Sequence, residues 1–140
     1  MKYREMGSTR VNASMFGLGC MRFNGEASGD STVDEQKAIS LIRRAIDGGV
    51  TYLDTAYTYL DKTSEIVVGK ALLDGYRDKV TIATKMPLGA VSDRASMEAV
   101  LAEQLGNCRP TILIFILCTV SIKMNGKNSR QSAPPNSLTI

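Results

Sequence analysis

The chain has 140 residues, enough for one domain with a hydrophobic core. Hydrophobic residues make up 44% and charged residues 22%, a composition that excludes an intrinsically disordered chain. The net charge of +3 comes from residues 107–140, which hold basic side chains but no Asp or Glu. The positive charge therefore does not indicate a nucleic-acid-binding face on the rest of the chain. We expect no nucleic-acid partner.

Cys20, Cys108 and Cys118 form neither a disulfide framework nor a metal-ligand pattern, so we expect no metal site and a reducing, cytoplasmic location. No apolar segment follows the first residues, so we expect no signal peptide. Residues 111–120 are strongly apolar, but the run is about half of the ~20 residues that a membrane helix needs. It predicts a buried or aggregation-prone strand, and we expect no association with a membrane.

Strands alternate with helices up to residue 106. Residues 3–6 and 11–14, separated by a turn that contains glycine, predict a short hairpin. Residues 16–19 predict a compact strand that ends in glycine, and a loop rich in Gly, Ser and Asp follows at 24–31.

The first predicted helix begins near Asp34 and Glu35, whose carboxylates favour a helix amino terminus. Gly48 and Gly49 end this helix, as glycine does at helix carboxyl ends. The residues expected to face the core recur at helical spacing and are Ala38, Leu41, Ile42, Ala45 and Ile46.

The second unit has a β-branched and aromatic strand at residues 50–54 and a helix at 64–73, which Ser64 and Glu65 are expected to cap. The third has a strand at 79–85 that Pro87 ends. Its helix begins at Ser92 or Asp93, and its expected apolar face consists of Met97, Val100, Leu101 and Leu105. Such alternation predicts an α/β fold with a parallel sheet. These three units alone do not distinguish a closed barrel from a doubly wound sheet.

A carboxylate, a phenol and an ammonium group follow two of these strands, at Asp54, Tyr59 and Lys85. The carboxyl edge of a parallel sheet is where α/β proteins carry out chemistry. A phenol is a weak acid, and a nearby ammonium that is paired with a carboxylate makes it a better proton donor. Such a donor suits an oxygen that gains negative charge as hydride reaches a carbonyl carbon. The alternative is that these residues have no catalytic role: Asp54 would then cap a turn, Tyr59 would be a core residue and Lys85 would lie on the surface.

Residues 52–59, followed by Ser64-Glu65 and then by 68–72, resemble the aldo-keto reductase signature of Asp-Thr-Ala, a Tyr, Ser-Glu and Gly-x-Ala-Leu. Residues 17–22 and 81–85 strengthen the resemblance, which covers 1–106. It implies a partial (β/α)8 TIM barrel: the first three to four β/α units, with an amino-terminal β-hairpin. It also implies NADPH-dependent reduction of a small aldehyde or ketone, with NADH as the alternative cofactor.

The family's catalytic residues are Asp, Tyr, Lys and His. The resemblance implies that Asp54 matches the Asp, that Tyr59 matches the proton-donating Tyr and that Lys85 matches the Lys. Tyr57 is then the structural tyrosine.

The cofactor-binding residues follow from the same resemblance. Gly19, Cys20 and Met21 match the segment after the first barrel strand, which faces the nicotinamide, and Asp54 is a further expected contact. These four positions are the expected cofactor contacts, and most of the family's cofactor site has no counterpart in the chain.

The chain departs from the family pattern after residue 106. It contains no histidine, and such a barrel needs roughly 250 residues. We expect 107–140 to be a non-homologous tail. When this tail is back-translated with permissible codons and one base is added before the codon of Asn107, the neighbouring reading frame encodes a segment that resembles the family's fourth strand. A single-base loss would then explain the tail, and Thr119 would stand where the catalytic His is expected. A divergent natural segment is the alternative.

The sequence leaves a second function open. Without the His and the later cofactor loops, residues 1–106 could form a non-catalytic half-barrel, a binding or regulatory module. Non-specific self-association is a further expectation, because a half-barrel has two open sheet edges. The opening also resembles a family branch with a carboxyl-terminal iron–sulfur domain, but no cysteine cluster for one is present.

Overall fold

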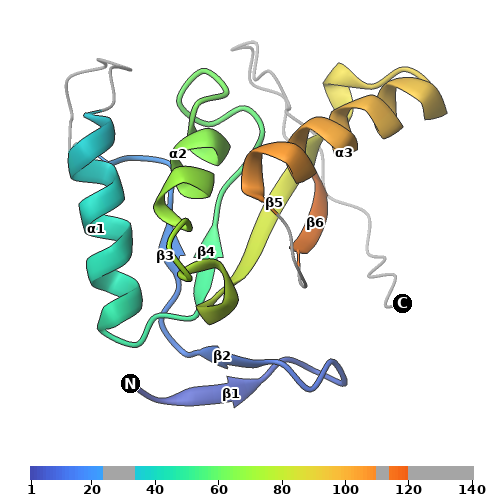
Figure 1. Ribbon diagram of the computed structural model, residues 1–140. Coiled ribbons are helices and arrows are strands. Elements are labelled where there is room, and N and C mark those ends of the chain that lie inside the picture. The colour runs from blue at the N-terminus through green and yellow to red at the C-terminus, as the bar shows by residue number, and fades with distance from the viewer. Residues whose placement is uncertain (24–33, 110–113, 120–140) are drawn as a thin grey trace, which may run out of the picture.

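Figure 1 shows a computed structural model of the chain, which describes residues 1–23, 34–109 and, for the backbone, 114–119. In this part of the chain a small hairpin lies at one end of a four-stranded sheet, and three α-helices lie side by side over one face of the sheet. The predicted loop at 24–31 is outside the described residues. The elements in chain order are β1 (Tyr3–Glu5), β2 (Asn12–Ser14), β3 (Leu18–Gly19), α1 (Glu35–Asp47), β4 (Tyr52–Asp54), α2 (Ser64–Ala71), the 3-10 helix η1 (Arg77–Lys79), β5 (Thr81–Pro87), the 3-10 helix η2 (Leu88–Ala90), α3 (Arg94–Cys108) and β6 (Ile114–Thr119).

The predicted hairpin is confirmed as β1 and β2, which pair antiparallel. The Tyr3 hydroxyl donates to the carbonyl oxygen of Gly49 at 3.1 Å. Ser14 and Thr51 exchange hydrogen bonds, since each backbone N–H reaches the other's side-chain oxygen at 2.8 and 2.9 Å. The hairpin is therefore fixed to the turn that leads into β4 and covers the end of the sheet where the strands begin (Figure 1).

The sheet is parallel throughout, in the order β3-β4-β5-β6. Its last strand, β6, confirms the strand predicted in the apolar run. Pro87 ends the third strand as predicted, but the predicted range of 79–85 is wrong by two residues at each end, because Lys79 belongs to η1 and Met86 and Pro87 still pair with β6. Pro87 has φ −79° and ψ 102°, an extended conformation that proline adopts readily, so it can be the last residue of a strand.

Helix α1 has the predicted ends. The carboxylate of Asp34 accepts from the backbone N–H of Lys37 at 3.1 Å, and Gly49 has φ +96° beyond the last turn. Its buried residues are Ala38, Ile42 and Ile46. The expectation that Leu41 is buried is wrong, because its side chain is 46% exposed. The apolar face is narrower than predicted, since among the described elements α1 packs chiefly against α2.

Helices α2 and α3 begin differently from each other. Thr63 is the amino-terminal cap of α2, so the expectation that Ser64 and Glu65 cap this helix is wrong; both lie buried in its first turn. Asp93 caps α3 as predicted, through a reciprocal pair of hydrogen bonds with Ser96.

The predicted apolar face of α3 is wrong as well. Met97 is exposed and the other three residues are half-buried, whereas Gln104 and Cys108 are buried. The reason is that only the carboxyl-terminal part of α3 lies over the sheet, while its first turns extend past β5 (Figure 1).

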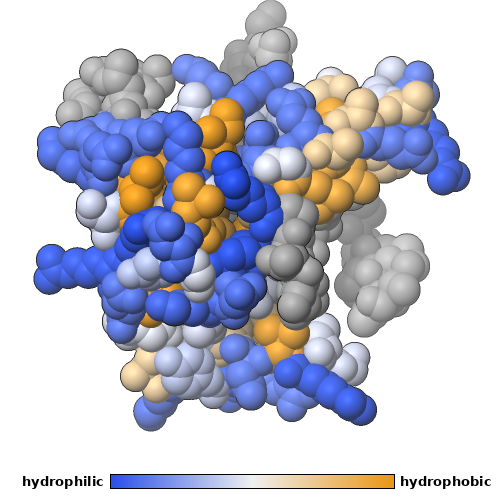
Figure 2. Space-filling model, in the orientation of Figure 1, coloured by the Kyte–Doolittle hydropathy of each residue, from blue (hydrophilic) through white to orange (hydrophobic). Residues whose placement is uncertain are grey.

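The core fills the space between α1, α2 and the strands. Its fully buried hydrophobic side chains include Ile42, Leu53, Val68 and Ile82. Figure 2 shows further hydrophobic residues that reach the surface between α1 and α2 and along α3. No helix in the described part of the chain is long and apolar enough to cross a membrane.

Candidate active site

The predicted site residues lie at the carboxyl ends of three neighbouring strands. Asp54 is the last residue of β4, and Lys85 lies on β5 two residues beyond Ala83, which pairs with Asp54. Gly19 ends β3 and is itself opposite Asp54 in the sheet. Because parallel strands end at one edge, groups from three sections of the sequence are brought together there.

The central contact is an ion pair between Lys85 and Asp54. The Lys85 ammonium donates to Oδ1 of Asp54 at 2.6 Å and to the carbonyl oxygen of Thr55 at 2.9 Å. It also lies 4.9 Å from the centre of the Tyr59 ring. The three side chains that sequence analysis selected are therefore in contact.

This environment changes the acidity of Lys85. Burial alone would lower the pKa of this ammonium, but the Asp54 carboxylate and the Tyr59 phenol raise it, and the net effect is a raised pKa. The side chain is only 20% exposed, so solvent screens these interactions weakly. Lys85 is accordingly a cation at neutral pH and presents positive charge to the phenol.

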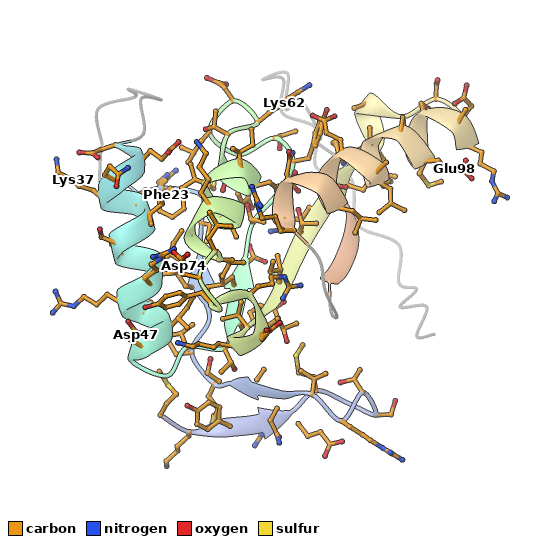
Figure 3. The ribbon with its side chains drawn as sticks, viewed as in Figure 1. Phe23, Lys37, Asp47, Lys62, Asp74 and Glu98 are labelled. Carbon is orange, nitrogen blue, oxygen red and sulfur yellow. The ribbon has the colours of Figure 1, made fainter. Side chains whose placement is uncertain are left out.

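The two nearby tyrosines have different surroundings. The buried Tyr57 donates its hydroxyl to Glu103 on α3 at 2.9 Å and accepts from the Lys62 ammonium at 3.2 Å. Figure 3 shows Lys62 in the loop above the amino-terminal end of α2. Tyr57 is thus held in a bridge between this loop and α3, whereas Tyr59 lies beside Lys85.

The loop that carries Tyr59 turns sharply after it. Leu60, Asp61 and Lys62 have φ values of 51°, 50° and 69°, a left-handed conformation that is unfavourable for residues other than glycine. Three in succession require support from the surrounding structure, which the cap of α2 and the bridge of Tyr57 supply.

The segment after β3 has an open side and a buried side. In the direction where a Cβ of Gly19 would point, no atom lies within 4 Å, and Met21 is exposed. Cys20 is fully buried, and its backbone N–H donates to the carbonyl oxygen of Asp54 at 2.7 Å. Burial, with a smaller effect of the Asp54 charge, raises the pKa of the Cys20 thiol to about 12. The Cys20 thiol is therefore neutral at physiological pH, and Gly19 and Met21 form the open side of this segment.

Known proteins are similar to this chain in sequence and in fold. The model of the aldo/keto reductase family matches residues 16–110. The chain belongs to the aldo-keto reductase family. It is 42% identical over 89 residues to the aldo-keto reductase YhdN of Bacillus subtilis, a match that covers 63% of this chain and 26% of the relative. It is 36% identical over 86 residues to a probable aldo-keto reductase of Glycine max, covering 61% of this chain and 24% of the relative. The chain thus spans about a quarter of the length of the curated relatives that it matches.

Solved aldo-keto reductases have the same fold. The holo form of AKR11C1 from Bacillus halodurans superimposes with a TM-score of 0.68 at 26% identity, over 84% of this chain and 40% of that one. The Klebsiella pneumoniae enzyme in complex with NADPH gives a TM-score of 0.60 at 28% identity, over 74% of this chain and 34% of that one. The hairpin and the four parallel strands are therefore part of a (β/α)8 TIM barrel.

Ser64 is a site residue that sequence analysis assigned only as a cap. Its hydroxyl donates to the carbonyl oxygen of Cys20 at 2.6 Å and lies 2.8 Å from the Thr55 hydroxyl. It therefore connects the segment after β3 with the residue after Asp54. The signal in the sequence was its place in the family signature, but neither spacing nor polarity indicated which groups it binds.

Sequence analysis also missed a polar network that is entirely buried. Glu65, Thr84 and Gln104 meet between α2, α3 and β5. Nothing in the periodicity of α3 distinguishes Gln104 from a surface residue, so no sequence signal predicted this contact.

Two surface hollows among the described residues lie away from this site. One of about 280 Å³ is at the opposite end of the sheet, where Asn12 and Thr51 border the start of β5. A second is on the outer face of α1. Neither is lined by Asp54, Tyr59 or Lys85. The described residues contain no group of three or more His, Cys, Asp or Glu side chains that could hold a metal ion.

Proposed function

We propose that this chain supplies the amino-terminal part of the active site of a reductase that uses NADPH, or NADH, to reduce a small aldehyde or ketone. The observation that supports this proposal best is the contact of Asp54, Lys85 and Tyr59 at the carboxyl edge of the sheet. In this arrangement a phenol lies next to a cation that a carboxylate holds in place.

In the proposed reaction Tyr59 donates a proton to the carbonyl oxygen of the substrate. The Lys85 ammonium stabilises the phenolate that remains, because its positive charge lies within 5 Å of the ring. Asp54 keeps Lys85 protonated and fixes its direction through the contact of 2.6 Å. Each role is one that these contacts make available.

The segment after β3 fits the nicotinamide end of a cofactor. Gly19 leaves open space in front of the strand end, and Met21 is exposed beside it. Gly19 and Met21 would contact the ring, and Cys20 would shape the segment through its backbone, held by Asp54 and Ser64. A bound reduced nicotinamide supplies the hydride. A solved relative in complex with NADPH supports this choice of cofactor.

Other parts of the family's site have no counterpart in the chain. It contains no His, and β6 ends at Thr119, which pairs with Pro87. We therefore expect no NADPH oxidation by the 140-residue chain itself with a broad panel of aldehydes and ketones.

The test of the proposed function is a chimera of residues 1–106 with the matching remainder of the Bacillus subtilis relative. We expect this chimera to oxidise NADPH when a carbonyl substrate is added. Tyr59→Phe should abolish turnover, because it removes the proton donor. Tyr57→Phe should retain turnover, because it removes only a hydroxyl that bonds to Glu103 and Lys62. An active Tyr59→Phe chimera would contradict the proposed proton donor.

We also propose that residues 107–140 arise from a shifted reading frame. Asn107 and Cys108 still complete the last turn of α3, so such a shift would fall inside this helix. Sequencing the DNA before the codon of Asn107 and restoring one base should open a frame of about barrel length, with His at the end of the fourth strand. A stop codon within a few residues of the restored base would exclude this origin.

A further inference from the structure

Three buried polar side chains meet on the helix side of β5. The Thr84 hydroxyl donates to Oε1 of Glu65 at 2.5 Å, and the Gln104 amide nitrogen donates to the same oxygen at 2.8 Å. Glu65 is on α2 and Gln104 is on α3, and all three side chains are at most 1% exposed. One carboxylate thus links two helices to one strand.

The network is adjacent in sequence to Lys85 but lies on the opposite face of the strand. Successive side chains of a strand point to opposite faces, so Thr84 lies with Ile82 and Met86 on the helix side while Lys85 faces Asp54. Ile82 belongs to the hydrophobic core, and Thr84 is the polar residue between two apolar ones. The Thr84 hydroxyl meets the Glu65 carboxylate only when β5 has its observed position under the helices, so this contact distinguishes that position from others.

Gln104 extends the network to the backbone of Lys85. Its amide nitrogen lies 3.2 Å from the carbonyl oxygen of Lys85, which also accepts from the backbone N–H of Tyr57 at 3.4 Å. The orientation of this amide follows from its neighbours, since Glu65, Thr84 and Lys85 all present oxygen atoms to it. In this orientation Oε1 of Gln104 is buried without a hydrogen-bond partner. The Gln104 side chain therefore donates to the acceptors at β5, while its own oxygen stays buried without a hydrogen bond.

We propose that Glu65 is a positioning residue for Lys85. By holding Thr84 and Gln104, its carboxylate fixes the register and rotation of β5, so that the ammonium of Lys85 points at Asp54 and Tyr59. This inference rests on the proposed function, because the position of Lys85 matters to that reaction.

The physical reason is that apolar packing alone specifies register weakly. A slip of β5 by one residue would turn Lys85 toward the helices and bring Thr84 or Met86 to Asp54. A fully apolar row on the helix side would tolerate such a slip better than a row with one hydroxyl that must reach Glu65. A single buried polar residue fixes register in a comparable way in coiled coils.

The test measures the titration of the Lys85 amine in the 140-residue chain by competitive acylation with acetic anhydride across a range of pH. Peptide mapping separates Lys85 from the exposed lysines, which serve as internal references. We expect Glu65→Leu to lower the pH of half-maximal labelling of Lys85, because the ammonium would lose Asp54 and Tyr59 while remaining partly buried. Each unit of this shift raises the unprotonated fraction below the pKa by about tenfold.

Two further variants separate positioning from general loosening of the fold. Glu65→Gln keeps an oxygen for Thr84 and Gln104, so it should retain the labelling profile of the parent chain. Val68→Ala removes buried apolar atoms one turn along α2 and should reduce stability without moving the Lys85 profile. An equal shift in Val68→Ala would overturn the positioning role.

A variant that removes only one hydroxyl is available if Glu65→Leu does not fold. Thr84→Val keeps the shape of the side chain and breaks the bond to Glu65, so it should shift Lys85 in the same direction. Folded Glu65→Leu or Thr84→Val chains with the parent profile would refute the proposal. This readout needs neither cofactor nor turnover. If the chimera were inactive while Glu65→Leu still shifted the labelling profile of Lys85, the result would contradict the proposed function but not the positioning role of Glu65.

Discussion

A Cβ atom on Gly69 would lie 1.9 Å from the carbonyl oxygen of Asn107. Helices α2 and α3 therefore touch backbone to backbone at this point, and no larger residue fits without moving one of them. We expect Gly69→Ala to lower the free energy of unfolding by about 1–3 kcal/mol, the usual effect of overpacking. Urea denaturation followed by circular dichroism would measure this change.

Gly106 provides the matched control for Gly69. It lies in the last turns of α3, and a Cβ there would meet no atom within 4 Å. Gly106→Ala should leave stability unchanged or raise it by up to about 1 kcal/mol, because alanine is the better helix former. If both substitutions had the same effect, helix propensity and not the close approach of α2 and α3 would explain Gly69.

The order of elements could be predicted from the sequence because each has a local signal. The hydrophobic period located α1, and carboxylates or glycines marked its ends. The errors occur where tertiary contacts decide. Leu41 has helical spacing, but no element in the described part of the chain covers it, and Met97 lies on turns of α3 that extend past the sheet. A sequence period reports which face is apolar, and the neighbours determine how wide the covered face is.

The candidate site was predicted in its members but not in its supports. Asp54, Tyr59 and Lys85 follow strands, and the parallel sheet brings their ends together for any sequence with this topology. The hydroxyl of Ser64 and the carboxylate of Glu65 act across 44 and 19 residues of sequence, on Cys20 and Thr84. Contacts over such separations depend on the packing of α2 and have no local signature.

Ser64 offers a direct test of one of these supports. Ser64→Ala would leave the carbonyl oxygen of Cys20 and the hydroxyl of Thr55 without their buried partner. We expect a loss of about 1–3 kcal/mol in the free energy of unfolding, the range for an unsatisfied buried polar group. Thr63→Ala is the control, because its hydroxyl bonds to the carbonyl oxygen of Leu60 at the exposed cap, so its loss should cost less.

The raised pKa of Lys85 predicts how its contribution to stability depends on pH. The folded chain holds this proton more tightly than the unfolded chain does, so the contribution is complete below the ordinary lysine pKa of 10.5. It is lost as the pH rises through the higher value of the folded chain. The stability difference between the parent chain and Lys85→Met should therefore be constant near neutral pH and shrink in alkali. In an Asp54→Asn background this dependence should weaken, and an unchanged dependence would show that Asp54 is not the cause.

The buried thiols predict a lack of reactivity in the folded chain. Burial raises the pKa of Cys20 and of Cys108 to about 12 each. At pH 8 only about one thiol in 10⁴ is then ionised, and the thiolate is the nucleophile. In a Cys118→Ser background, an aromatic disulfide reagent should therefore label neither thiol until denaturant opens the fold.

Met21→Cys supplies the positive control for this labelling. Its side chain is exposed immediately after Cys20, so a thiol there should react at once and show that reagent reaches the end of β3. Rapid labelling of Cys20 itself in the native chain would mean that the segment after β3 opens readily. That segment would then be too mobile to hold a nicotinamide against Asp54. If Cys20 is protected while Cys at position 21 reacts, the backbone of the segment is fixed and one of its sides is open.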